Sequence, residues 1–160
     1  MKRIVIATLL ISCLSLSACK TTNGVHEIKD DSGKIGNLKE NSLEYFNSVV
    51  KNKIYFSTNK DDLTAEAVST LLAQASWLNS NHKYKATIEG HCDERGTREF
   101  NLALGERRAN MTKRELVKNG VDRKRLKTIS YGKERPEVEG SSEEVWSMNR
   151  RVFTLLQDAE

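Results

Sequence analysis

One acidic and one basic residue, fifteen positions apart in the sequence, could together hold a ligand that carries both charges. Asp93 follows a predicted strand, and Arg108 lies on the apolar face of the helix predicted next. A guanidinium on a buried face is costly unless a carboxylate or another anion meets it. An internal ion pair within the fold would satisfy Arg108. We favour a ligand site, because an unpaired Asp93 and an unpaired Arg108 can border one cleft and hold the ammonium and carboxylate of a zwitterion.

The run His91-Cys92-Asp93-Glu94 also contains groups that serve in metal and thiol chemistry. Consecutive side chains on an extended loop point alternately apart, so we do not expect all four to reach one metal ion. The sequence has no Cys-x-x-Cys motif and no pair of histidines spaced for one helical face. Cys92 with His91 as its base would lack an orienting partner. We therefore expect no metal, no cofactor and no enzymatic activity.

Helices and strands with clear apolar patterns must position these residues. Helices are predicted from Leu38 to Val49, from an N-cap at Thr64 to about Asn79, and from Thr97 to Asn119. Strands are predicted at 54–56, 84–89, 126–131 and 151–156, with a polar loop around Pro136 before the last. This order predicts an α/β sandwich in which a mixed four-stranded sheet packs against two main helices.

The first eighteen residues have the pattern of a signal peptide, because Lys2 and Arg3 precede an apolar run that ends in small and hydroxylated residues. Lys20 stops the run before the roughly 20 apolar residues that a membrane span needs. Leu16-Ser17-Ala18-Cys19 resembles a bacterial lipobox, which implies cleavage before Cys19 and lipid on its thiol. An ordinary secretory signal and a retained inner-membrane anchor are the alternatives. Lipoproteins held in the inner membrane tend to carry Asp where this chain has Lys20, so we expect the outer membrane.

Charge and cysteine content change once this segment is set aside. The 160 residues include 26 basic and 22 acidic side chains, and loss of Lys2 and Arg3 lowers the charge from +4 to +2. Cys13 leaves with the signal and Cys19 would carry lipid, so Cys92 has no partner for an intrachain disulfide.

The best nucleic-acid candidate is the basic cluster Arg123, Lys124, Arg125 and Lys127. A solvated surface is the better explanation, and we expect no nucleic-acid partner for an exported protein.

Three segments follow from these patterns. Residues 1–18 are predicted to be the signal peptide, and residues 19–36 a lipidated flexible tether, since they are polar, contain three glycines and show no apolar period. Residues 37–160 are predicted to form one domain that begins with a short helix.

Several motifs in this order resemble the OmpA C-terminal-like domain family over about residues 51–157. The segments that carry the resemblance are Ile88–Thr97, Asn101–Asn110, Gly120-Val121, Ser130–Pro136 and Asn149–Val152. The resemblance is strongest to those members that are lipoproteins associated with peptidoglycan. It implies the β-α-β-α-β-β order of that family and a domain that binds the diaminopimelate of peptidoglycan non-covalently.

The resemblance also implies roles for particular residues. By position, Asp93 and Arg108 are the two main ligand contacts, and Thr97, Asn101 and Leu104 match further positions of the site. The family often has Phe-Asp where this chain has Thr58-Asn59, so Asn59 offers an amide in place of a second carboxylate. A tether between the outer membrane and the wall, serving envelope integrity and cell division in a Tol-Pal system, is the expected function. Its expected partners are peptidoglycan, outer-membrane lipid through Cys19, and a TolB-like periplasmic β-propeller.

One alternative stays open. The chain could be an interaction module of the Tol system whose wall binding is weak or lost, because Asn59 lacks the charge of an aspartate. Cys92, where the related lipoproteins have a small residue such as Ala or Thr, is the second departure from the family pattern.

Overall fold

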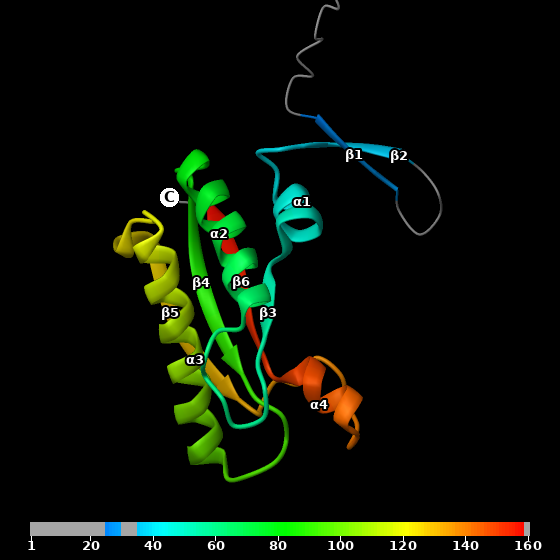
Figure 1. The fold of residues 1–160 in the computed structure, drawn as a ribbon, viewed down its shortest axis with the longest axis vertical. Coiled ribbons are helices and arrows are strands. Elements are labelled where there is room, and N and C mark those ends of the chain that lie inside the picture. The colour runs from blue at the N-terminus through cyan, green and yellow to red at the C-terminus, as the bar shows by residue number, and fades with distance from the viewer. Residues whose placement is uncertain (1–24, 30–34, 159–160) are drawn as a thin grey trace, which may run out of the picture.

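A mixed four-stranded sheet forms the centre of the protein in a computed structural model that describes residues 25–29 and 35–158 (Figure 1). Its strands are β3 (Lys53–Tyr55), β4 (Tyr84–His91), β5 (Leu126–Gly132) and β6 (Arg151–Asp158). They lie in the order β3-β6-β4-β5, with β4 and β5 parallel and the other neighbours antiparallel. The predicted fold class is therefore confirmed, although β4 and β6 extend two residues beyond the predicted strands.

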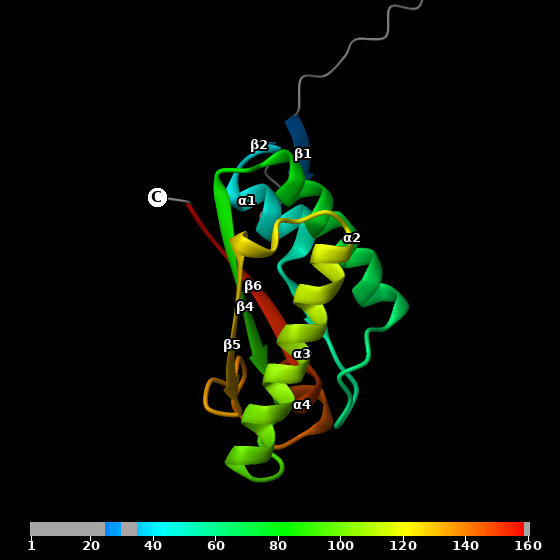
Figure 2. The ribbon, with the colours of Figure 1, turned by 90° about the vertical axis from the view of Figure 1, so that its left-hand side faces the viewer.

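Two long helices, α2 (Ala65–Ser80) and α3 (Arg98–Lys118), cover one face of this sheet (Figure 2). Both begin where the sequence predicts, because the hydroxyls of Thr64 and Thr97 accept hydrogen bonds from the backbone N–H groups of Ala67 and Phe100. The opposite face of the sheet is not covered by any described helix (Figure 2).

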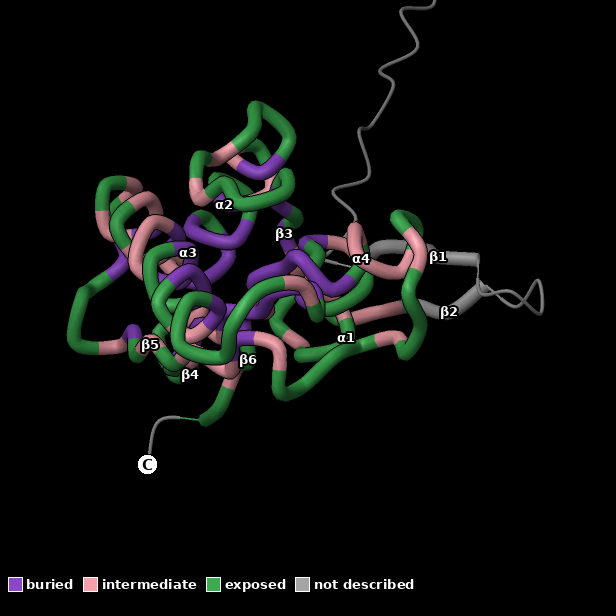
Figure 3. The backbone as a smooth tube through the Cα atoms, turned by 90° about the horizontal axis from the view of Figure 1, so that it is seen from below, coloured by how far each residue is buried: buried purple, intermediate pink, exposed green. Residues whose placement is uncertain are grey.

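The core lies between the helices and the sheet, where the tube in Figure 3 is buried along its centre. Ile88 of β4, Leu71 of α2 and Leu116 of α3 are each fully buried there. Gln74 is a polar member of this layer; its amide donates to the carbonyl of Lys51 at 2.8 Å and accepts from the hydroxyl of Thr154 at 3.0 Å. The amide nitrogen and the amide oxygen of this buried side chain thus each have a hydrogen-bond partner, as burial requires.

The segment that leads into β3 is helical, as predicted, but shorter. It consists of α1 (Leu43–Tyr45) and a π-helical stretch, Phe46–Lys51. Leu38 lies instead in a strand. Phe46 is fully buried with its ring centroid 4.9 Å from that of Trp77, so this segment packs against α2.

The structure corrects part of the tether prediction. The sequence predicts a flexible segment as far as residue 36. Instead, β1 (Val25–Lys29) and β2 (Ile35–Lys39) pair as an antiparallel hairpin. The predicted signal, the lipobox and Cys19 lie outside the described residues. Within the described ranges, no helix is both long enough and apolar enough to span a membrane.

The polar loop around Pro136 contains a helix that the pattern did not predict. Helix α4 (Glu143–Asn149) is two turns long and is capped by the hydroxyl of Ser142, which accepts from the N–H of Val145. A single 3₁₀ turn, Arg123–Arg125, precedes β5. Helix α4 lies beside the start of β6 and the site described next (Figure 1).

Candidate functional site

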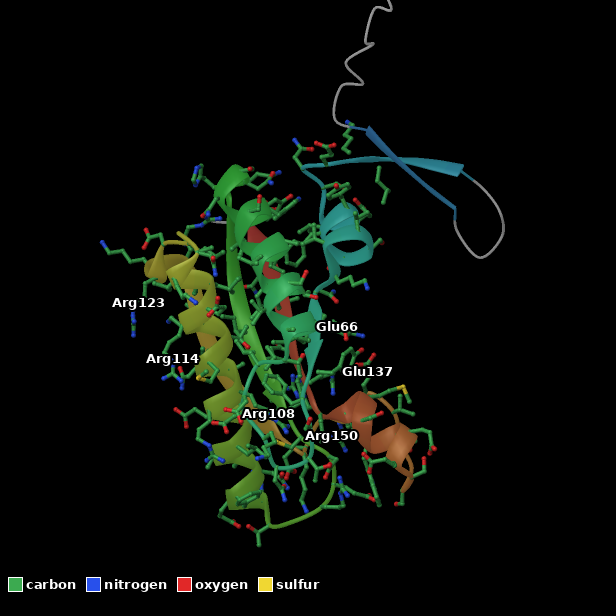
Figure 4. All side chains as sticks on the ribbon, in the orientation of Figure 1. Glu66, Arg108, Arg114, Arg123, Glu137 and Arg150 are labelled. Carbon is green, nitrogen blue, oxygen red and sulfur yellow. The ribbon has the colours of Figure 1, made fainter. Side chains whose placement is uncertain are left out.

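The carboxyl end of β4 is where the predicted site residues gather. The loop 92–97 joins β4 to α3 there, the turn Ser57–Lys60 follows β3, and α4 leads into β6. The labelled side chains of Arg108 and Arg150 come from α3 and from the end of α4, and both lie at this end (Figure 4). Three stretches far apart in sequence, one of them running from the loop 92–97 into α3, therefore meet at one cluster of charged groups.

Asp93 is paired with two arginines, so the expectation of an unpaired carboxylate is wrong. Arg95 donates from Nη2 to Oδ2 at 2.7 Å and from Nε to Oδ1 at 3.1 Å, a bidentate contact. Arg150 donates from Nη1 to Oδ2 at 3.3 Å. The backbone N–H of Arg95 also donates to Oδ1, at 3.1 Å. An Asp two residues before its partner readily forms such a local turn, which sequence spacing alone would allow.

These contacts set the ionisation of Asp93. Burial raises the pKa of the carboxyl group. The hydrogen bonds from Arg95 and Arg150 and the charge of Arg95 lower it by a larger amount, so the net pKa lies below its ordinary value. Asp93 is therefore a carboxylate at neutral pH, with only 7% of the residue exposed. A ligand cation would have to approach through this arginine cover.

Arg108 is completely buried, as the helical pattern predicts, but its guanidinium binds neither an internal carboxylate nor open solvent. It donates to the carbonyl oxygens of Lys60 at 2.8 Å, His91 at 2.9 Å and Ser57 at 3.1 Å. Its Cζ lies 4.9 Å from the ring centroid of Phe56. Within the described part of the chain, no carboxylate lies at salt-bridge distance from Arg108.

The predicted internal ion pair is therefore absent from the described residues, and three backbone carbonyl oxygens take its place. Burial lowers the pKa of its guanidinium, because removal from water disfavours the charged form. The three carbonyls belong to β4 and to the turn after β3, so Arg108 joins these two segments to α3. A ligand carboxylate would meet Arg108 only if the turn Ser57–Lys60 moved.

Helix α4 closes one side of the cluster. Glu143 accepts from Arg150 Nη2 at 2.7 Å and lies 3.8 Å from Arg95 Nη1. Trp146 stacks under Arg95, with 4.0 Å between the guanidinium Cζ and the ring centroid, and its indole N–H donates to Glu94 at 3.0 Å. Asp93, Arg95, Glu143 and Arg150 therefore form a continuous network of alternating charges.

The other predicted site residues have mostly positioning contacts. Asn101 is buried, and its amide donates to the carbonyl of Arg95 at 2.8 Å, which holds the loop. Leu104 is buried in α3, and Thr97 is the exposed N-cap already described. Asn59 is exposed in the turn after β3 with φ 55°, in the left-handed region that Asn tolerates. Thr58 beside it accepts a hydrogen bond of 3.4 Å from Arg95, which places this turn next to the network.

His91 and Cys92 do not form a reactive pair. Burial lowers the pKa of His91 to about 4, and repulsion by Arg151 acts in the same direction. Burial also raises the pKa of the Cys92 thiol, which favours the unreactive protonated form. Cys92 instead donates to the carbonyl of Asn101 at 3.4 Å. Across residues 25–29 and 35–158, no three His, Cys, Asp or Glu side chains are grouped as a metal site would require.

Two cavities bear on where a ligand could bind, and only one of them lies near these elements. One of about 150 Å³ borders the network and is lined by Cys92, Glu94, Lys133 and Asn149, among others. A larger cavity of about 480 Å³ lies between the leading segment and α2, lined in part by Val49 and Trp77. Neither cavity is lined by Asp93 or Arg108, but the smaller one is lined by the neighbours of Asp93 in the loop, so the charged network is the better ligand candidate.

Arg95, Arg150, Glu143 and Trp146 were missed by sequence reasoning. Arg150 had a usable signal, because Asn149-Arg150-Arg151 stands directly before an apolar strand and such arginines need buried partners. Arg95 also had one, because an Asp two residues before an Arg can form a local turn. Glu143 and Trp146 had none, since both lie on α4, which the pattern did not predict. The basic cluster 123–127 divides in the structure: Arg125 donates to the carbonyls of Leu78, Asn81 and Tyr84, while Arg123 points away from the domain (Figure 4).

Known proteins share both sequence and fold with this chain. The OmpA family matches residues 55–150. The peptidoglycan-associated lipoprotein of Mesorhizobium japonicum is 42% identical over 153 residues, which cover 94% of this chain and 90% of that protein. The peptidoglycan-associated lipoprotein of Agrobacterium fabrum is 46% identical over 127 residues, covering 79% of this chain and 72% of that protein.

Solved structures agree with this similarity. The crystal structure of the peptidoglycan-associated lipoprotein from Burkholderia pseudomallei has a TM-score of 0.67 at 33% identity, and the match covers 69% of this chain and 96% of that chain. The C-terminal domain of Helicobacter pylori MotB has a TM-score of 0.63 at 19% identity, covering 67% and 84% of the two chains, and shares the fold alone. The range matched by the family contains Asp93, Arg95, Arg108 and Arg150.

Proposed function

Because the chain belongs to the OmpA family, we propose that it is an envelope lipoprotein that binds peptidoglycan without a covalent bond. The relatives at 42% and 46% identity bear the name peptidoglycan-associated lipoprotein, which supports this function. The protein acts as a tether and not as an enzyme.

The observation that carries the proposal is the buried carboxylate of Asp93 inside the arginine network at the carboxyl end of β4. Diaminopimelate in a stem peptide presents an ammonium and a carboxylate on one carbon. Asp93 accepts from the ammonium, and Arg108 beneath the turn Ser57–Lys60 supplies positive charge for the carboxylate. Asn59 and Thr97 lie at the rim of this site, while Asn101 and Leu104 fix the loop and helix that form it.

The anchor completes the proposed tether. Lipid on Cys19 holds the chain in the outer membrane with the domain facing the periplasm, and residues 20–36 span part of the gap. A single acyl chain binds a membrane only weakly, so more than one is expected on Cys19. Strand β1 and the start of β2 lie in this stretch, and their hairpin shortens its reach relative to an extended chain.

A second function is favoured by Asn59. The exposed amide gives the ligand ammonium no second negative charge, so wall binding could be weak. In that case the chain would serve chiefly as an interaction module of a Tol-Pal system, bound to a TolB-like β-propeller, in support of envelope integrity and cell division. Both roles can use the same face in turn.

Co-sedimentation with purified diaminopimelate-type peptidoglycan tests the proposal. We expect the full chain, purified in detergent, to pellet with the wall, and Asp93→Asn to remain largely in the supernatant. Arg108→Lys should bind less than the native chain, since Lys keeps the charge but cannot hold the carbonyl oxygens of Ser57, Lys60 and His91 together. Arg108→Ala is a poor probe because the side chain is fully buried.

Asp158→Asn is the matched control. Asp158 pairs in register with Tyr84, at the end of β4 opposite to the site. Its substitution by Asn removes the same charge as Asp93→Asn does. It should pellet as the native chain does. Equal pelleting of Asp93→Asn and the native chain would refute the site. A chain that binds a purified TolB-like propeller but ignores peptidoglycan would support the second function, and release of soluble muropeptides would contradict a non-enzymatic role.

A further inference from the structure

Both carboxylate oxygens of Asp93 are occupied by arginine, although the proposed function needs this carboxylate for a ligand ammonium. We propose that Arg95 is an internal competitor for the ligand: its guanidinium holds the ammonium position on Asp93 and turns toward α4 when an ammonium-bearing ligand binds. This inference rests on the proposed function and adds a residue that sets its affinity and its selectivity for cationic groups.

The two arginines on Asp93 differ in how firmly they are held. The side chain of Arg150 is 8% exposed, and its Nε donates to the carbonyl of Phe56 at 3.0 Å. The side chain of Arg95 is 37% exposed and covers the solvent side of the network. Arg150 is therefore a fixed partner that keeps Asp93 ionised, while Arg95 is the partner that can leave.

Arg95 already touches the groups that would receive it. Its Nη1 lies 3.8 Å from Glu143 Oε2, and its guanidinium lies over the ring of Trp146. The carboxylate of Glu143 is 58% exposed and can follow the arginine. A turn of the side chain toward α4 thus exchanges one carboxylate for another and keeps the aromatic contact.

The backbone does not need to move in this exchange. The N–H of Arg95 donates to Asp93 Oδ1, and its carbonyl accepts from the amide of Asn101 at 2.8 Å. These two bonds hold the loop while the long side chain rotates. The loop geometry that presents Asp93 is therefore the same with Arg95 in either position.

Selectivity follows from the charges. A ligand ammonium replaces a guanidinium, so the charge around Asp93 stays balanced after the exchange. A ligand without a cation at that position would displace Arg95 and leave a partly buried carboxylate with one partner fewer. The competitor thus rejects neutral groups more strongly than an open carboxylate would.

Calorimetric titration of the full chain in detergent with a soluble stem peptide ending in meso-diaminopimelate tests the inference. Arg95→Ala should bind about tenfold more tightly than the native chain, and Arg95→Lys, which has no fork, should lie between them. Arg98→Ala is the matched control, because Arg98 carries the same charge three residues on but pairs with Glu134 instead. It should change the affinity by no more than about twofold, the size expected of a screened surface charge.

The outcomes separate the two proposals. If Asp93→Asn binds the peptide as the native chain does, the ligand site itself is wrong. If Asp93→Asn loses binding but Arg95→Ala binds no more tightly than the native chain, the site stands and the competitor is overturned. Equal gains for Arg95→Ala and Arg98→Ala would also overturn it, since general electrostatics would then explain both.

A spectroscopic measurement follows the exchange directly. In ¹⁵N-labelled chain, the Nε–H signal of Arg95 should shift when the peptide is added, and the indole signal of Trp146 should shift with it. The Nε–H of Arg125, bonded to the carbonyl of Tyr84, and the indole of Trp77 should stay in place. An unchanged Arg95 signal in the presence of bound peptide would rule out the exchange even if a variant failed to fold. A peptide acetylated on the diaminopimelate amine should leave the Arg95 signal unmoved.

Discussion

Gly90 of β4 and Gly105 of α3 lie against each other so closely that a Cβ on Gly90 would overlap the carbonyl oxygen of Gly105. This contact sets the separation of the sheet and the half of α3 that carries Arg108. The overlapping atom belongs to the backbone and has no room to withdraw. The site geometry therefore depends on two residues without side chains.

Gly90→Ala should destabilise the fold by about 3 kcal/mol or more, since overpacking of a rigid backbone contact displaces a helix. Gly105→Ala should be milder. Its Cβ would meet the Ser130 hydroxyl, which can rotate, although the carbonyl oxygen of Gly90 would still be 3.0 Å away. Ser130→Ala combined with Gly105→Ala should recover part of the loss. Urea unfolding measures all three, and equal midpoints for Gly90→Ala and the native chain would contradict the packing argument.

Arg108→Met should lower the free energy of unfolding by about 2–4 kcal/mol, because it removes hydrogen bonds to three carbonyl oxygens that hold separate segments. Arg108→Lys should lose less. Arg107→Met provides the comparison: Arg107 is the next residue of α3, half exposed, and pairs with Asp61 on the surface. Its effect should stay within about 0.5 kcal/mol. Similar losses for the two methionine variants would mean that the carbonyl cage contributes little.

Stability should fall between pH 6.5 and pH 4 because of His91. Its pKa is lowered from 6.5 to about 4 by burial, with repulsion from Arg151 in the same direction, so in this range the unfolded state binds more protons than the folded state. The contribution is complete above pH 6.5 and is lost by about pH 4, and amounts to about 3 kcal/mol. Glu89, whose pKa is raised chiefly by burial, opposes this trend at the acid end.

The difference between native chain and His91→Asn isolates this effect. Unfolding free energies from urea titrations at pH 7.5 and pH 4.5 should show a smaller pH-dependent loss in the variant. His82→Asn, at an exposed position before β4, should keep the native slope. Parallel pH profiles for native chain and His91→Asn would show that the buried imidazole does not govern the acid sensitivity.

Asn59→Asp should strengthen binding of the diaminopimelate peptide by about threefold to tenfold, since it adds a carboxylate next to the network. Aspartate also tolerates the left-handed backbone that Asn59 adopts. The gain should shrink as salt rises, because the side chain is exposed. Asn47→Asp, exposed on the π-helical stretch away from the site, should give no gain in the same titration.

Much of this architecture can be predicted from the sequence, because caps and apolar periodicity are local signals. The hydroxyls of Thr64 and Thr97 mark the starts of α2 and α3, and alternation along 84–89 marks a strand with one buried face. Arg108 follows from the same reasoning, since its position in the helical period requires burial. Such local signals are enough to predict burial wherever a residue's position within its own helix or strand decides its environment.

The remainder depends on contacts between distant segments. The spacing of Asp93 and Arg95 allows their contact, but the second partner of Asp93, Arg150, is 57 residues away. Residue types also do not reveal which backbone carbonyl oxygens Arg108 binds. Helix α4 is short and polar, so it shows no apolar stripe. The sequence therefore indicates where charged groups gather, while their pairing appears only once the segments are brought together.

The position of β3 has a mechanical consequence for a tether. The chain enters the domain at the end where α1 lies, and the site lies at the end near α4 (Figure 1). In the tether proposed above, tension between membrane and wall would run along β3, parallel to the strand. The ladder Lys53–Tyr55 on β6, with flanking bonds from Thr154 to Asn52 and from Phe56 to Arg150, is then loaded in shear, so its hydrogen bonds resist the pull together and do not open one at a time.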